Sequence, residues 1–190
     1  NQDAYQLGAN RSCIRELFEY GRSRAAVVGE ENVFDYSLGN PSIPAPPEVN
    51  QAVEEILRDT PSLLVHGYTS AVGDRAARQA IADDLNRRYN ADCRAEEFFL
   101  GCGAAPELAA VFAALAVPEG ELVVIAPYFP EYKVFAQGAG LKFREVAPDV
   151  PNFQIRLEAV EAMLTPHTQA VLINSPNNPS GVVYTRQTLQ

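Results

Sequence analysis

Apolar residues recur along the chain with helical spacing near its start and again before its middle. Five of them lie on one helical stripe, which predicts an amphipathic helix over residues 12–28: Ile14, Leu17, Phe18, Ala25 and Val28. Alternation over residues 34–38 predicts a short strand, and the proline-rich stretch 39–47 excludes regular structure. Pro47 suits the first turn of a second helix, which carries Val49, Ala52, Val53, Ile56 and Leu57. Residues 74–89 are typical of a third helix, whose inward side would be Ala77, Ile81, Leu85 and Tyr89.

From residue 98 onward, short apolar runs alternate with helical patterns. The runs predict strands at 98–100, 122–126, 141–146 and 170–173, and the patterns between them predict helices at 106–116, 130–137 and 157–164. Buried strands joined by helices imply a mostly parallel, doubly wound α/β sheet with helices on both faces. In such a sheet, ligands bind in the loops that leave the carboxyl ends of the strands.

Composition narrows the class of protein. The chain carries 15 Lys and Arg against 24 Asp and Glu, for a net charge of −9. An acidic chain lacks the basic footprint that nucleic acids require, and its apolar runs are too short to cross a membrane. Three cysteines without paired spacing (Cys13, Cys93 and Cys102) make a disulfide framework or a zinc site improbable and suit a reducing, cytoplasmic compartment. The glycosylation-like triplet at 10–12 is too short to outweigh this.

Three loops at predicted strand ends have unusual compositions. Residues 101–107 are small and lead into a helix, so the amides of Ala104 and Ala105 could bind a phosphate. Residues 126–132 bring aromatic side chains that could stack on a flat heterocycle. Residues 175–181 contain two prolines and could hold an asparagine amide as a fixed donor. Each loop alone is also explained by structure: a tight turn, a core aromatic, or a surface turn. Together they suit a flat, phosphorylated, oxygen-bearing aromatic cofactor.

Two common nucleotide-binding motifs do not fit the first loop. The dinucleotide fingerprint starts correctly at Gly101 and Gly103, but Pro106 occupies the third glycine position. The triphosphate-binding loop is excluded because the chain contains no Gly-Lys-Ser/Thr sequence.

From about Phe34 to its end, the chain resembles the class I/II aminotransferases, fold-type-I enzymes that depend on pyridoxal 5′-phosphate (PLP). The most specific motif is Ser-Pro-Asn-Asn-Pro-Ser-Gly at 175–181, which is similar to the family's Asn-Pro-Thr/Ser-Gly signature. Supporting motifs follow in the family's order at residues 38–41, 67–73, 101–105 and 127–132. The resemblance implies transfer of an amino group between an amino acid and a 2-oxo acid.

The resemblance also implies site residues. Gly103, Ala104 and Ala105 would hold the cofactor phosphate, Phe129 would stack on the pyridine ring, and Tyr132 would lie nearby. Asn178 would donate to the phenolic oxygen and so tune the pKa of the Schiff base, and the Asn178–Pro179 bond would be cis. Gly39 would lie beside the substrate carboxylate, while Tyr68 would reach the phosphate of a partner subunit, so a homodimer is expected.

The same resemblance implies a domain division and a truncation. Residues 1–45 would be an N-terminal arm with part of the small domain, and residues 46–190 the first part of the PLP-binding large domain. The chain starts at Asn1 and stops as a helix begins after Thr185, so we expect it to be a fragment. The family's Schiff-base lysine would lie downstream, and neither lysine present, Lys133 or Lys142, is assigned that role. We therefore expect no catalytic residue in these 190 residues and no activity from them alone.

Three alternatives remain open at this stage. The complete protein could be a PLP-dependent carbon–sulfur β-lyase on the same scaffold. It could also be a regulator that uses an aminotransferase-like domain to bind an effector, although only 33 residues precede Phe34. Finally, the loops could be purely structural. The amino acid and oxo acid substrates are not encoded in this part of the chain.

Overall fold

The computed structural model describes residues 2–9, 13–39, 41 and 43–190, with the side chains of residues 3 and 4 left out. Contacts divide the chain into two compact units, residues 1–71 and residues 72–190. Each unit is described separately below. None of the described helices is both long enough and apolar enough to span a membrane.

The first unit consists of helices joined by irregular segments. They are α1 (Gln2–Ala9), α2 (Cys13–Val28), η1 (Glu30–Asn32), α3 (Pro47–Asp59) and α4 (Ser62–Val65). The predicted helices over 12–28 and from Pro47 are confirmed, although residue 12 and the triplet 10–12 lie outside the described residues. The predicted strand at 34–38 is wrong. The backbone N–H and the hydroxyl of Ser37 both donate to Asp35 Oδ1, at 2.8 and 2.6 Å. Such a local turn competes with strand pairing.

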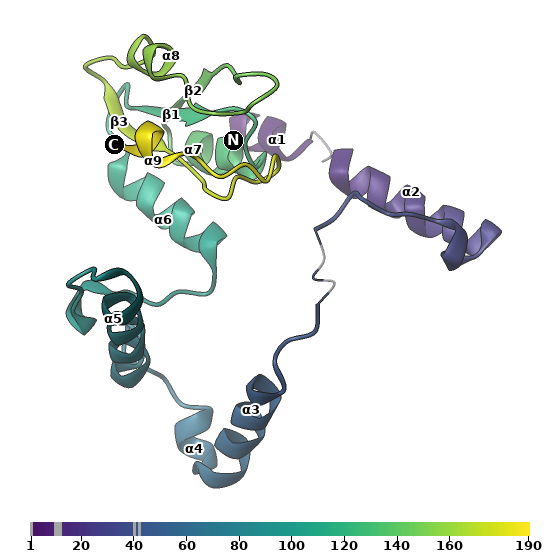
Figure 1. The fold of residues 1–190 in the computed structure, drawn as a ribbon, viewed down its shortest axis with the longest axis vertical. Helices are drawn as coiled ribbons and strands as arrows, with labels where there is room; N and C mark the ends of the chain where they lie inside the picture. The colour runs from purple at the N-terminus through teal and green to yellow at the C-terminus, as the bar shows by residue number, and fades with distance from the viewer. Residues whose placement is uncertain (1, 10–12, 40, 42) are drawn as a thin grey trace. The chain divides into compact units, whose positions relative to one another are not determined.

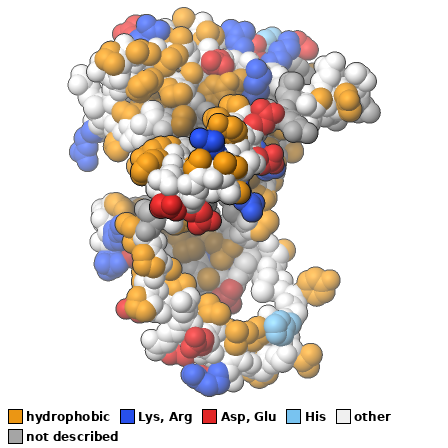
Figure 2. All heavy atoms as spheres, turned by 90° about the vertical axis from the view of Figure 1, so that its right-hand side faces the viewer, with side chains coloured by type: hydrophobic (Ala, Val, Ile, Leu, Met, Phe, Trp, Pro, Cys, Tyr) orange, Lys and Arg blue, Asp and Glu red, His pale blue; other side chains and the backbone are white. Residues whose placement is uncertain are grey.

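Large apolar side chains of this first unit remain at its surface. The described helices α2, α3 and α4 contain no buried residue, and Figure 2 shows hydrophobic side chains at the surface in its lower part, where Figure 1 places α3 and α4. On α3 they form one stripe, which consists of Val49, Val53, Ile56 and Leu57. This unit therefore has helices with an apolar face but, among its described residues, no core.

The second unit opens with α5 (Arg75–Tyr89) and η2 (Ala95–Glu97), which pack together. The Asp74 side chain caps α5 by accepting from the Ala77 N–H at 2.9 Å. The inward side predicted for this helix is wrong, because the buried residues are Arg78 and Ala82. Arg78 is buried because its guanidinium donates to the Ala95 carbonyl at 2.8 Å.

The rest of the second unit is built on a three-stranded parallel sheet. The strands are β1 (Glu121–Ile125), β2 (Lys142–Val146) and β3 (Thr168–Leu172), in the order β2-β1-β3. The helices are α6 (Ala104–Leu115), α7 (Glu131–Gly138), α8 (Leu157–Glu161) and α9 (Arg186–Leu189). The predicted parallel α/β fold is confirmed, and each of these strands lies within two residues of its predicted position at either end. The predicted strand at 98–100 is wrong: Leu100 donates to the Val72 carbonyl at 3.2 Å, and no ladder forms there.

Helices cover both faces of this sheet. Leu122 and Val124 pack with Phe112 of α6 and Ala136 of α7 on one face. Val123 and Ile125 point to the other face, where Ala159 and Val160 of α8 pack against them. Figure 1 shows α8 above the sheet and α6 and α7 below it. Every residue of β1 is buried, and each large apolar side chain buried in this way contributes about 1.5–3 kcal/mol.

Candidate active site

Three segments of the second unit lead toward the same edge of the sheet. Since the strands are parallel, the loops that follow β1 and β3 leave from a common edge. Helix α6 packs along the sheet through Leu108 and Phe112, and its C-terminal end leads into the start of β1. Its N-terminus therefore points toward the edge where the two loops lie. This arrangement agrees with the position predicted for a ligand.

The first segment exposes backbone donors. Helix α6 begins at Ala104, directly after Gly103. The φ angle of Gly103 is 120°, a backbone conformation that residues other than glycine rarely adopt. No side chain caps the helix there, and the first N–H groups of a helix have no partner within it. The amides of Ala104 and Ala105 are therefore available to an anion. A Cβ atom on Gly101 would lie 1.4 Å from Glu107 Oε1, so a larger residue there would displace this carboxylate.

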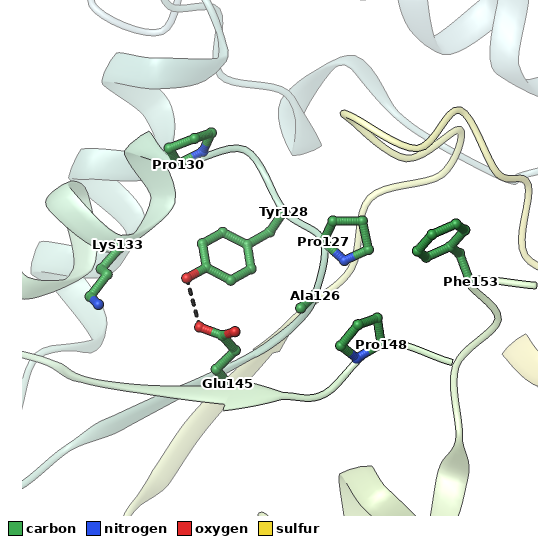
Figure 3. Close-up of a pocket in the computed structure, with 8 residues that line it drawn as sticks. All are labelled: Ala126, Pro127, Tyr128, Pro130, Lys133, Glu145, Pro148 and Phe153. Carbon is green, nitrogen blue, oxygen red and sulfur yellow. Dashed lines mark hydrogen bonds between the residues drawn. The ribbon is translucent and has the colours of Figure 1, made fainter. Parts of the chain in front are cut away.

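The second segment places two neighbouring aromatic rings against different partners. The half-buried Phe129 ring meets the Tyr132 ring edge-on, with centroids 5.6 Å apart, and burial raises the pKa of the Tyr132 hydroxyl. Tyr128 instead packs against Phe143, at 5.0 Å between centroids. Its hydroxyl donates to Glu145 Oε2 at 2.8 Å (Figure 3). Burial, together with this bond to the carboxylate, raises the pKa of Tyr128 to about 12.

A shallow pocket of about 480 Å³ lies on the Tyr128 side of this segment (Figure 3). The residues lining it are Ala126, Pro127, Tyr128, Pro130, Lys133, Glu145, Pro148 and Phe153. Neither Phe129 nor Asn178 is among them, so the pocket adjoins the predicted cofactor residues without containing them. Lys133 is exposed, and Lys142 pairs with Glu119.

The third segment is held by asparagines. The Asn177 side chain is only 6% exposed and donates through Nδ2 to the Pro127 carbonyl at 3.2 Å. The Asn178 backbone N–H donates to Asn174 Oδ1 at 2.9 Å, and its side chain is exposed. The Asn178–Pro179 bond is cis, as predicted. The second and third segments are thus in direct contact through Pro127 and Asn177. Phe129 lies two residues after Pro127, and Asn178 directly follows Asn177.

Two predicted site residues belong to the first unit. Tyr68 is fully exposed, and a Cβ atom on Gly39 would meet nothing within 4 Å. Both residues thus belong to a different unit from the three segments. Among the described residues, no group of three or more His, Cys, Asp or Glu side chains is placed to hold a metal ion.

Sequence reasoning missed two features of this site. Asn177 was treated as part of a motif whose functional residue is Asn178, and Glu145 was not considered as a partner for Tyr128. Residue type does not separate Asn177 from Asn178, because burial and the bond to Pro127 are what distinguish them. The Tyr128–Glu145 pair depends on strand register, which links Val124 of β1 to Glu145 of β2.

Comparisons with known proteins agree with the family resemblance that the sequence motifs indicate. The sequence model of the family described as "Aminotransferase class I and II" matches residues 31–190. An aspartate aminotransferase of Thermotoga maritima is 35% identical over 171 residues, which are 89% of this chain and 44% of that protein. An arginine–pyruvate transaminase of Pseudomonas aeruginosa is 33% identical, over 88% of this chain and 42% of that protein. The crystal structure of an amino transferase from Eubacterium rectale matches with a TM-score of 0.94 and 51% identity, over 100% of this chain and 48% of that one. The chain thus spans less than half the length of the proteins it resembles.

Proposed function

The chain belongs to the class I and II aminotransferases, and on that premise we propose that the complete protein is a PLP-dependent transaminase that moves an amino group between an amino acid and a 2-oxo acid. The observation that carries the proposal is the contact between the loops after β1 and β3. It holds the segment of Phe129 and the segment of Asn178 together at the carboxyl edge of the sheet. Family membership and fold, by contrast, leave the reaction open among PLP enzymes.

The described residues fit PLP in three respects. The uncapped N-terminus of α6 offers amides of the kind that bind phosphate. Phe129 offers a half-buried aromatic ring that can stack on the pyridine. Among the residues that the structure describes, no hydrogen bond engages the side-chain amide of Asn178, so this amide is free to donate to an oxygen. These groups match the phosphate, the ring and the phenolic oxygen of the cofactor.

We assign the roles accordingly. Gly103, Ala104 and Ala105 hold the phosphate, Phe129 stacks on the ring, and Asn178 donates to the phenolic oxygen. Tyr132 supports Phe129 through its edge-on contact. These assignments are proposals.

Two further roles involve residues of the first unit. Gly39 lies beside the substrate carboxylate, and Tyr68 reaches the phosphate bound by a second copy of the chain in a homodimer. The full exposure of Tyr68 supports its availability to a partner. We also propose a division between residues 1–45 and 46–190 and a cytoplasmic location.

The chemistry follows from what these residues can do. PLP, when bound, draws electrons from the substrate's α-carbon and so makes its proton acidic. The α6 amides and Phe129 fix the group's position before the substrate arrives, which lowers the entropy cost of reaction. The Asn178 amide favours negative charge on the oxygen that it contacts. The lysine that anchors the cofactor and moves the proton lies outside residues 1–190 in this proposal, so the chain by itself has no activity.

The test uses the complete protein with PLP and a panel of amino acid and 2-oxo acid pairs. We expect visible absorbance on adding PLP, a higher melting temperature, and formation of a new amino acid from the oxo acid. Phe129→Ala and Asn178→Ala should each weaken PLP binding by about tenfold, which corresponds to the loss of one good contact. Phe153→Ala, which alters the neighbouring pocket, is the matched control and should bind PLP normally.

Other results would indicate other functions. Release of a thiol and ammonia from a sulfur-containing amino acid, without amino transfer, would favour a carbon–sulfur β-lyase. PLP binding without turnover would favour an effector-binding module. Absence of both absorbance and stabilisation would contradict the proposal.

Residues 1–190 alone give a further expectation. Their exposed apolar stripe on α3 should cause self-association, which light scattering would detect. A monodisperse monomer at high concentration would contradict this.

A further inference from the structure

Asn177 is one of three polar or charged residues that are buried among those the structure describes, with Arg78 and Glu121. Arg78 lies in the α5 region, and Glu121 lies at the start of β1, where it accepts from Thr165 at 2.7 Å. Asn177 is the one that lies in a loop at the carboxyl edge of the sheet. A buried amide costs free energy unless its donors and acceptor are bonded, so its bonds indicate what it stabilises.

Most of the bonds of Asn177 close the third loop on itself. Its backbone N–H donates to the Val182 carbonyl at 2.9 Å, and its own carbonyl accepts from the Gly181 N–H at 2.7 Å. Its side-chain oxygen accepts from both the N–H and the hydroxyl of Ser180, at 3.1 and 2.7 Å. The loop that carries Asn178 is therefore folded around the Asn177 oxygen.

One side-chain bond of Asn177 connects the third segment to the second. Asn177 Nδ2 donates to the Pro127 carbonyl, a residue 50 positions earlier in the chain. Asn178 follows Asn177 directly, and Phe129 lies two residues after Pro127. An amide is suited to this double role, because it accepts on one side and donates on the other. Asn174 and Ser175 also bond within the third segment, to Asn178 and Tyr184, but those bonds do not reach the second loop.

We propose that Asn177 is a positioning residue that sets the Asn178 amide relative to the Phe129 ring, so that one bound group can meet both. This inference rests on the proposed function, because the bound group is PLP. Loss of the link would leave the two loops intact but free to shift relative to each other. The Asn178 donor would then miss the phenolic oxygen. Since that donor favours the ionised phenolic oxygen, its loss would raise the pKa of the Schiff base that the cofactor forms.

The experiment measures PLP affinity and the pH midpoint of the bound cofactor's absorbance change in the complete protein. For Asn177→Ala we expect PLP binding about tenfold weaker and a midpoint raised by about one pH unit, which is the scale of one hydrogen bond. Asn177→Ser is the second variant, should Asn177→Ala not fold. Its hydroxyl can still accept from Ser180 but is too short to reach Pro127, so it should raise the midpoint in the same direction.

Asn86→Ala is the matched control. The Asn86 side chain also bridges two segments by donating to the Cys93 carbonyl at 2.8 Å and accepting from the Cys93 N–H at 2.7 Å. It lies on α5, away from the three segments, so its loss should lower the melting temperature without moving the midpoint. This separates positioning from general stabilisation.

The outcomes are distinguishable. If the unaltered protein binds PLP and the Asn177 variants that fold keep its midpoint and affinity, the positioning role is overturned while the proposed function stands. If only the melting temperature falls, as in Asn86→Ala, Asn177 is structural and the inference is again overturned. If the unaltered protein does not bind PLP, the proposed function fails and the inference fails with it.

Discussion

The two units of the chain respond differently to the same kind of sequence pattern. In residues 1–71, apolar stripes form helices whose large side chains stay exposed, such as Leu57 at 58%. In residues 72–190, apolar runs form a sheet whose central strand is buried throughout, with Leu122 at 1%. The apolar pattern therefore predicts the long helices of both units and the strands of the second, but burial requires a second surface that only the later unit contains among its described residues. The predictions below test how far that difference extends.

The largest expected difference concerns a leucine in each unit. Leu122→Ala should lower the unfolding free energy of the complete protein by about 2–5 kcal/mol, because it leaves a cavity between helices and sheet. Leu57→Ala should change it by less than about 0.5 kcal/mol, as is usual for an exposed position. Urea unfolding of both variants measures the difference. Equal losses would show that α3 is covered in the complete protein, and the contrast between the units would then be a property of residues 1–190 alone.

Replacing one glycine by alanine in each unit should change the stability by a smaller amount, and in opposite directions. Gly73 has a φ of +91°, and a Cβ atom there would lie 2.6 Å from the Leu100 Cβ, so Gly73→Ala should destabilise the protein by about 1–3 kcal/mol. Gly8 lies in α1 with nothing within 4 Å, so Gly8→Ala should stabilise that helix by about 0.5–1 kcal/mol. Thermal unfolding of the two variants would show this. A stabilised Gly73→Ala would mean that the turn before α5 is not packed against Leu100.

The smallest expected effect concerns a tyrosine in each unit and depends on pH. Tyr128→Phe removes the bond to Glu145 and should cost about 1 kcal/mol near neutral pH. Folding raises the pKa of Tyr128 from 10.0 to about 12. Its stabilisation is therefore complete below pH 10 and is lost as the pH rises through 12. The gap in unfolding free energy between the two proteins should narrow over that range.

Tyr36 supplies the control for this titration, because it is 93% exposed in the first unit. Tyr36→Phe should leave the unfolding free energy unchanged at every pH. Denaturant unfolding at about pH 8 and about pH 11 is sufficient to compare the two variants. A gap for Tyr128→Phe that stays constant with pH would show that its hydroxyl is not held by Glu145.

The sequence predicted most of the second unit because its elements are marked by local signals. The helix after Asp74 begins at a residue with a clear capping preference, and β1 contains the continuous apolar run 122–125. The motifs also identified the loops that meet at the sheet edge. Those predictions required only spacing and residue type.

Apart from the strand expected at 34–38, which a local turn at Asp35 and Ser37 replaces, the predictions that were wrong depended on contacts between residues far apart in the chain. Arg78 is buried because it bonds to the carbonyl of Ala95, which no hydrophobic stripe reveals. Residues 98–100 have a strand-like sequence, but among the described residues their backbone N–H groups donate to Ala95 and Val72 instead of to a neighbouring strand. Asn177 could not be separated from Asn178 by residue type, because burial and a bond to Pro127 distinguish them.

The order of the strands also determines in which direction the sheet can grow. β2 forms one edge and carries Lys142, Arg144 and Glu145, which an approaching strand would have to accommodate. Charged side chains of this kind protect a sheet from pairing with other chains. β3 forms the opposite edge, and its sequence Thr-Gln-Ala-Val-Leu contains no charge. New strands, whether added during synthesis or in refolding, would therefore extend the sheet from β3, while β2 remains its outer border.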